Sequence, residues 1–272
     1  MSYIKKLIIL SLFFTYLSAS SLQSNVKNFV GENKYYENKY LILNIFKDKK
    51  SFYKHGSFDY VKIFDTLKNN GLFNVNYKSV QDVNIEIYSN AKTVKTIKSI
   101  KDVLLNLGYS YYFTKNIKKE ENKLSWEIYF KSESVLDPLA FIKELNKLNI
   151  RVNDVKRITS TKWAYKIDVN YANISNSIKV TKDEIKKLRK PHRDYVLEVN
   201  NINRLYVTSH RLNQWYPSIA FYDKDFNLIK LDEQSSIKKK IIMDVPQGTK
   251  FISISDTYNL INIKRGITVT VN

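Results

Sequence analysis

Histidines are the first residues to consider for catalysis or metal binding, and the chain has three: His55, His192 and His210. They stand far apart, without a second histidine or a carboxylate at the spacing of a zinc site or a catalytic triad. Cysteine is absent, no G-x-S-x-G turn presents a serine, and the six glycines form no phosphate-binding loop. The sequence therefore predicts a protein that is not an enzyme and needs no metal or cofactor.

Two pairs of acidic residues have a structural explanation. Asp223 and Asp225 separate two alternating apolar runs, and Asp183 with Glu184 stands beside Thr181 at the start of a helix-like stretch. Turns and helix caps favour these residue types. We predict turn and capping roles for both pairs, and no acid–base role.

Aromatic residues make up 14% of the chain and are the remaining candidates for binding. Trp126 and Trp163 lie in strand-like stretches, which predicts core or sheet-face positions. The polar loop "SHRLNQWYPS" differs, because its aromatic pair could stack on a sugar ring or anchor a protein partner. The alternative is that the pair folds over the end of its domain. The candidate contact residues of this loop are Arg211, Asn213, Gln214, Trp215 and Tyr216.

Strand-like stretches that alternate apolar and polar residues recur about every 40 residues, a spacing typical of one supersecondary unit per repeat. Helical patterns that end at Gly71, Gly108 and Asn149 separate them. Each helix is followed by a second extended stretch. The four strand-like stretches are "LILNIF" (Leu41–Phe46), "VNIEIY" (Val83–Tyr88), "SWEIYF" (Ser125–Phe130) and "AYKIDV" (Ala164–Val169).

Three tandem strand-helix-strand repeats are thus predicted over residues 40–170, after an N-terminal segment at 21–39. Such units place helices on one face of a mainly antiparallel sheet, as in ferredoxin-like folds. This layout resembles the small βαβ modules of bacterial envelopes, including SPOR-type domains, which bind septal peptidoglycan. The likeness is one of pattern, and no site residue follows from it.

The second half of the chain has a different pattern. Residues 171–191 read as a linker, with a short helix that begins at Thr181 and ends before Pro191. Residues 192–272 contain short strands and turns, with hairpin signals at "FYDKDFNLI" and "VPQGTKF", and predict a β-sandwich. This region resembles accessory sandwiches of the prepeptidase C-terminal and maltose-operon periplasmic protein types, which implies binding or docking. The predicted fold class is α+β, with ferredoxin-like repeats followed by an all-β sandwich.

The N-terminus and the charge point to location and partners. Residues 1–20 have the layout of a secretory signal peptide: Lys5 and Lys6, an apolar run from Leu7 to Leu17, and small residues after it. The alternative is an uncleaved N-terminal anchor. The formal net charge of +19 would be +17 without the two lysines, which favours anionic partners, although AT-rich coding would also enrich lysine.

These patterns together predict a non-catalytic periplasmic scaffold or adaptor, which contacts envelope proteins through exposed sheet edges. The alternative is a binding module for anionic glycan, peptidoglycan or lipopolysaccharide. Nucleic acid is not an expected partner, and no membrane span is expected after the signal peptide.

Overall fold

The computed structural model describes residues 21–54, 56–90 and 92–272, in two compact units. The first unit contains residues up to 91 together with 100–172, and the second contains 92–99 together with 173–272. The first is α+β and the second consists mostly of strands, so the predicted fold class is confirmed. The predicted signal peptide and His55 lie outside the described residues.

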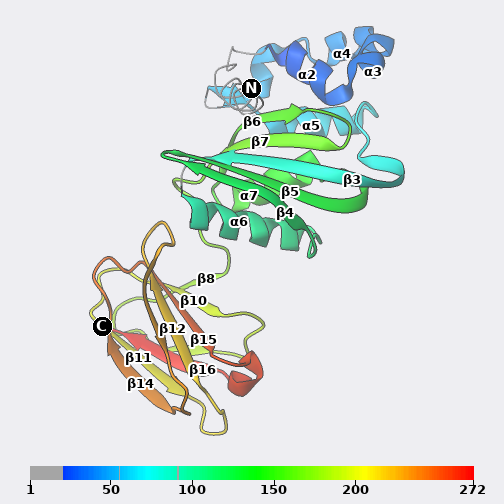
Figure 1. Ribbon diagram of the computed structural model, residues 1–272. Helices are drawn as coiled ribbons and strands as arrows, with labels where there is room; N and C mark the ends of the chain where they lie inside the picture. The colour runs from blue at the N-terminus through cyan, green and yellow to red at the C-terminus, as the bar shows by residue number, and fades with distance from the viewer. Residues whose placement is uncertain (1–20, 55, 91) are drawn as a thin grey trace, which may run out of the picture. The chain divides into compact units, whose positions relative to one another are not determined.

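The first unit is built on a five-stranded sheet in the order β4-β5-β3-β7-β6, in which β3 and β7 are parallel and the other neighbours antiparallel (Figure 1). Its strands are β3 (Asn76–Ser89), β4 (Phe113–Glu120), β5 (Lys123–Ser134), β6 (Arg151–Arg157) and β7 (Lys162–Asp168), and a two-stranded hairpin is formed by β1 (Tyr53–Lys54) and β2 (Ser57–Phe58). The helical segments are α2 (Leu22–Val30), α3 (Glu32–Glu37), α4 (Lys39–Ile45), η1 (Lys49–Phe52), α5 (Tyr60–Asn69) and α7 (Pro138–Lys147). Helix α6 (Thr93–Asn106) is divided between the units, and its residues from Ile100 on belong to the first.

One face of this sheet carries the core. Trp163 of β7 is buried against Phe29 of α2 and Phe64 of α5, with ring centroids 6.2 Å apart in each pair. On the same face, Tyr165 meets Phe141 of α7 at 4.9 Å. Because side chains alternate between the faces of a strand, these large apolar side chains fall on the face that the helices cover.

The other face of the sheet is polar. Lys162 lies 2.6 Å from the carboxylate of Glu86, and Lys115 lies 3.0 Å from that of Glu127. Polar and charged side chains on alternate positions of β3, β5 and β7 explain the alternating pattern in the sequence.

Helix α7 begins as the sequence predicts. The side chain of Asp137 accepts a hydrogen bond from the backbone N–H of Leu139 at 3.0 Å, and Pro138 occupies the first turn. Lys68 of α5 also contacts the carboxylate of Asp137 at 2.7 Å, so the start of α7 is tied to its neighbour.

The first predicted strand is wrong. Residues 41–46 belong to helix α4 and its C-cap, where the N–H of Phe46 bonds to the carbonyl of Ile42 and both side chains are buried. A short apolar run does not distinguish strand from helix, and this pair four residues apart fits a helical face. The first repeat therefore lacks its opening strand, and its closing stretch runs into Val83–Tyr88 as the single long strand β3.

The two edges of the sheet differ. Next to β6, Asn28 of α2 donates to the carbonyl of Arg157 at 2.8 Å and accepts from its N–H at 2.9 Å. The guanidinium of Arg157 in turn donates to the carbonyl of Phe29. Figure 1 shows α2, α3 and α4 on the β6 side of the unit. The end of the β6 edge at Arg157 is thus bonded to helix α2, and β4 forms the opposite edge of the sheet.

The second unit is a sandwich of a five-stranded sheet, β13-β12-β15-β10-β8, and a four-stranded sheet, β14-β11-β16-β9. Its core side chains come from both sheets, with Trp215, Phe221 and Val269 fully buried. The elements are β8 (Ser177–Lys179), β9 (Lys186–Leu188), β10 (Tyr195–Glu198), β11 (Arg204–Ser209), β12 (Pro217–Tyr222), β13 (Leu228–Glu233), β14 (Lys240–Asp244), β15 (Phe251–Asp256), η2 (Leu260–Ile263) and β16 (Ile267–Val271).

The predicted helix at 181–190 is wrong, since this stretch forms a turn and then strand β9. Glu184 does accept hydrogen bonds from the N–H and hydroxyl of Thr181, as in a capping box. Asp183, however, has φ 62° and donates its N–H to the carbonyl of Val271. Leu188 then packs into the sandwich core, so contacts with β16 override the local helix signal.

One of the two predicted hairpins is confirmed. Strands β12 and β13 pair across the turn in which Asp223 accepts from the N–H groups of Asp225 and Asn227. The turn at Pro246 and Gly248 also exists, but it joins β14 to β15, which belong to different sheets. In the described parts of the chain, no helix has the length and apolar character that crossing a membrane requires.

Candidate functional site

The predicted contact loop at 209–218 does not form one binding surface. Trp215 is 0% exposed, and its indole N–H donates to the carbonyl of Ser255 at 2.8 Å. Asn213 is also buried, where its amide donates to Ser209 and to the carbonyl of Gly266. Trp215 and Asn213 therefore follow the alternative prediction, in which the loop folds onto its own domain.

The other three residues of that loop lie nearer to solvent. Tyr216 is half-buried and its ring meets that of Tyr258 edge-on at 4.9 Å. Arg211 and Gln214 are exposed. What remains accessible is a pair of tyrosines and two polar side chains, without the tryptophan that motivated the prediction.

The two histidines that the structure describes form no metal site. His192 and His210 are exposed, and the His210 ring accepts the N–H of Leu212 at 3.1 Å. Across the described ranges, no three histidine or acidic side chains lie close enough together to hold a metal ion.

Strand β4 is the first surface that could recognise a partner. All eight of its residues are exposed, and its backbone pairs with β5 alone among the described elements. Phe113 is 53% and Ile117 42% exposed, although both are large and apolar. A long edge strand with free backbone groups and exposed apolar side chains is a template for pairing with another strand.

The charge on β4 is positive. It carries Lys115, Lys118 and Lys119 against the single acid Glu120. Lys115 pairs with Glu127 of β5, but Lys118 and Lys119 make no ion pair with any residue that the structure describes. The open edge therefore offers two uncompensated ammonium groups.

Strand β13 is a second open edge, in the sandwich. Leu228, Ile229 and Leu231 are exposed along its six residues. Its one lysine, Lys230, is outnumbered by Asp232 and Glu233. This edge is shorter than β4 and carries the opposite net charge.

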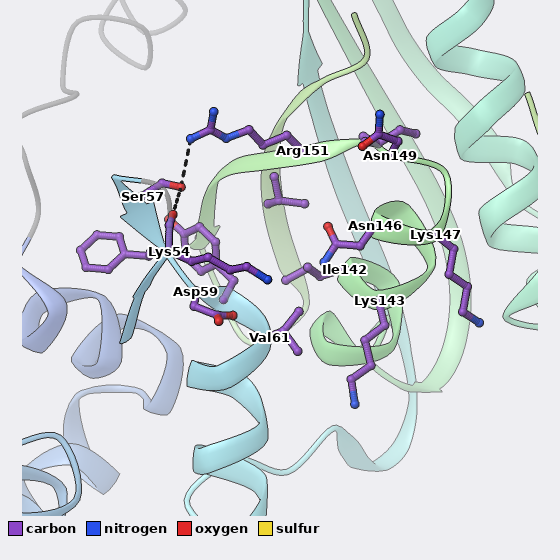
Figure 2. Close-up of a pocket in the computed structure, with 14 residues that line it drawn as sticks. Lys54, Ser57, Asp59, Val61, Ile142, Lys143, Asn146, Lys147, Asn149 and Arg151 are labelled. Carbon is purple, nitrogen blue, oxygen red and sulfur yellow. Dashed lines mark hydrogen bonds between the residues drawn. The ribbon is translucent and has the colours of Figure 1, made fainter. Parts of the chain in front are cut away.

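A cleft of about 860 Å³ is the second candidate site, shown in Figure 2. It lies in the first unit between the β1–β2 hairpin, the start of α5, the end of α7 and the start of β6. Its apolar lining includes Phe58, Val61 and Ile142, whereas its polar lining includes Lys54, Ser57, Asp59, Lys143, Asn146, Lys147, Asn149 and Arg151.

The cleft contains four basic side chains and one carboxylate. That carboxylate, Asp59, already caps α5 by accepting the N–H of Lys62 at 3.0 Å. Arg151 donates to the hydroxyl of Ser57 at 3.2 Å, and this hydroxyl donates to the carbonyl of Lys54 (Figure 2). The side chain of Lys54 points across the cleft toward Ile142.

A neutral hydroxyl forms part of the wall. Tyr60 donates to the carboxylate of Asp154 at 3.0 Å, and burial raises the pKa of Tyr60 well above its ordinary value. Burial also raises the pKa of Asp154. The cleft is therefore polar and cationic at its rim. In its wall, the Tyr60 hydroxyl already has a hydrogen-bond partner in Asp154.

Sequence reasoning missed both surfaces for identifiable reasons. Strand β4 begins within "YSYYFTKNI", which the repeat pattern identifies as extended, but the pattern does not say which strand lies at an edge of the sheet. The cleft brings Lys54 and residues 57–61 against 142–152, and no spacing rule connects segments so far apart.

Comparisons with known proteins identify no family for this chain, so a proposal about its function must rest on these two surfaces. No protein-family model matches the chain, and no curated protein matches it either.

Proposed function

We propose that this protein is a non-catalytic docking protein, a scaffold or adaptor, and that β4 receives an extended segment of a protein partner as an additional strand. The observation that carries the proposal is the contrast between the two sheet edges. Asn28 and Phe29 of α2 bond to Arg157 at the end of β6, and three of the seven β6 residues are exposed, whereas β4 is exposed over all eight residues. A long edge strand that no other element covers is a template for strand addition, and the lysines and the irregularity at Lys115 restrict which strands can pair with it.

Strand addition explains how β4 would bind without a pocket. Each partner residue facing the edge would exchange backbone hydrogen bonds with β4, which supplies affinity with little dependence on sequence. Phe113 and Ile117 would bury apolar area against alternate side chains of the partner. Specificity would then come from charge.

Charge complementarity selects an acidic partner segment. Lys118 and Lys119 would lie beside the added strand, and opposite charges on neighbouring strands are favourable. A second copy of β4 is disfavoured, because its three lysines would face three lysines of the same kind. The occupant we propose is an extended segment in which apolar residues alternate with Asp or Glu.

Defined peptides test this directly. An eight-residue fluorescent peptide that alternates Val and Glu should bind, and the matched peptide that alternates Val and Lys should not. Lys118→Glu should weaken binding about fivefold or more, because an attraction becomes a repulsion. Fluorescence anisotropy at low and physiological salt measures both effects, and the affinity should fall as salt rises.

The matched control lies on the competing edge. Lys230→Glu of β13 makes the same change of charge on an exposed strand and should leave the affinity unaltered. Loss of binding in Lys230→Glu with retention in Lys118→Glu would place the partner on β13 and contradict the proposal.

Location and assembly belong to the same proposal. The signal-like layout of residues 1–20 supports export to the periplasm, where the partners would be envelope proteins. The resemblance of the first unit to SPOR-type modules is compatible with this role. It supplies no residue for it.

A further inference from the structure

We infer that the cleft between the β1–β2 hairpin and α7 binds an anionic sugar, meaning a sugar ring that carries a carboxylate or a phosphate. This site is separate from strand β4 and does not depend on the docking role. It also moves glycan recognition away from the Trp215 loop, whose tryptophan and asparagine are buried.

The size of the cleft suits a small molecule. A volume of about 860 Å³ falls within the range of small-molecule sites, roughly 300 to 1,000 Å³. Two stretches of chain that are far apart in the sequence form the walls, so the cleft depends on the folded unit. The bond from Arg151 to Ser57 links β6 to the hairpin across one side of the cleft.

Basic side chains give the cleft a positive charge. The ammonium of Lys54 makes no hydrogen bond or ion pair with a described residue, and its side chain points over the cleft (Figure 2). Arg151 presents a guanidinium on the opposite segment, and Lys143 and Lys147 add charge along α7. Lys147 pairs with Glu144, so the ligand's acid group would lie nearer Lys54. A carboxylate or phosphate accepts charge-assisted hydrogen bonds from such groups.

The lining also fits the rest of a sugar. Ser57, Asn146 and Asp59 offer acceptors and donors for ring hydroxyls, and the Asn146 amide points into the cleft. Phe58 and Ile142 give an apolar surface for the C–H face of the ring. A plain inorganic anion would use the cations and leave this surface without a partner.

The experiment is an NMR titration of the intact protein with four probes at millimolar concentrations: glucose, glucuronate, glucose 6-phosphate and inorganic phosphate. Glucuronate or glucose 6-phosphate should shift the amide signals of Ser57, Asn146 and Arg151, and their relative affinities identify the acid group. Glucose should bind at least about tenfold more weakly, because it lacks the charge-assisted hydrogen bonds.

Variants locate the site. Lys54→Gln and Arg151→Gln should each weaken binding of the anionic sugar about tenfold. Lys78→Gln is the matched control, because Lys78 is exposed on β3 outside the cleft lining. Far-ultraviolet circular dichroism confirms that each variant is folded.

Three results would overturn the inference: no binding of either anionic sugar, equal binding of glucose, or equal losses in Lys78→Gln and Arg151→Gln. Inorganic phosphate binding as tightly as glucose 6-phosphate would contradict the sugar assignment.

Discussion

Two buried tyrosines differ in whether their hydroxyl group has a hydrogen-bond partner, which affects the stability of the fold. The hydroxyl of Tyr165 is fully buried, and no described residue bonds to it. The hydroxyl of Tyr60, also in a buried residue, donates to Asp154. An unmade hydrogen bond in a core costs more than a made one contributes, so the two hydroxyls should have opposite effects on stability.

We therefore expect Tyr165→Phe to raise the free energy of unfolding by about 1 to 3 kcal/mol, since it removes a polar group that folding desolvates without compensation. Tyr60→Phe should lower it by about 1 kcal/mol. Urea denaturation of both variants measures the difference. Equal losses in the two variants would show that the Tyr165 hydroxyl has a partner in solution.

At the surface, Glu184 provides a prediction about pH. Hydrogen bonds from Lys186 and Thr181 lower the pKa of Glu184 to about 2, from an ordinary value of 4.5. Because the folded pKa is the lower one, this contribution to stability is present above about pH 4.5 and is lost as the pH falls toward 2. NMR titration of the carboxyl carbon should give a midpoint near 2, and Lys186→Gln should raise it. An unchanged midpoint in Lys186→Gln would exclude the ion pair as the cause.

At the scale of elements, packing between strands decides where side chains are tolerated. Gly266 precedes β16 with φ +81°, and a Cβ there would lie 2.1 Å from the carbonyl oxygen of Leu188. Gly248 has nearly the same φ, +82°, but nothing lies within 4 Å of its Cβ position. The two glycines share a backbone requirement and differ in the space around them.

Gly248→Ala should cost about 1 to 2 kcal/mol of unfolding free energy for its left-handed backbone. Gly266→Ala should cost clearly more, since β9 must also move away from β16. Thermal or urea unfolding of the two variants compares them within one sandwich. A smaller loss for Gly266→Ala would contradict the register of β9 against β16.

Local pattern predicts most elements of this chain, and long-range contacts explain the failures. The stretches at Val83–Tyr88 and Ser125–Phe130 lie in strands as predicted, and so does Ala164–Val169 up to Asp168, because one face of each strand is buried. Leu41–Phe46 fails because its apolar residues also fit a helix. The capping box at Thr181 forms without a helix, because burial of Leu188 in the sandwich core stabilises the chain more than a short helix would.

At the scale of the whole molecule, the candidate sites are harder to predict from the sequence than the helices and strands. Trp215 looks like a ligand contact in a polar loop, but the fold brings Ser255 to its indole and buries it. The edge at β4 is recognised once the sheet order is known. The cleft is recognised once Lys54 and residues 57–61 are placed against 142–152. The excess of lysine is evident in the sequence, but its placement on an open edge is not.

The central claim is that β4 accepts an acidic strand, and backbone amide exchange measured by NMR tests it most directly. Exchange is compared between the free protein and the protein saturated with the Val–Glu peptide. We expect slower exchange at alternate residues of Phe113–Glu120, namely those whose N–H groups point away from β5, with little change elsewhere. Unchanged exchange along β4, with protection confined to β13 or to the cleft residues, would contradict the account.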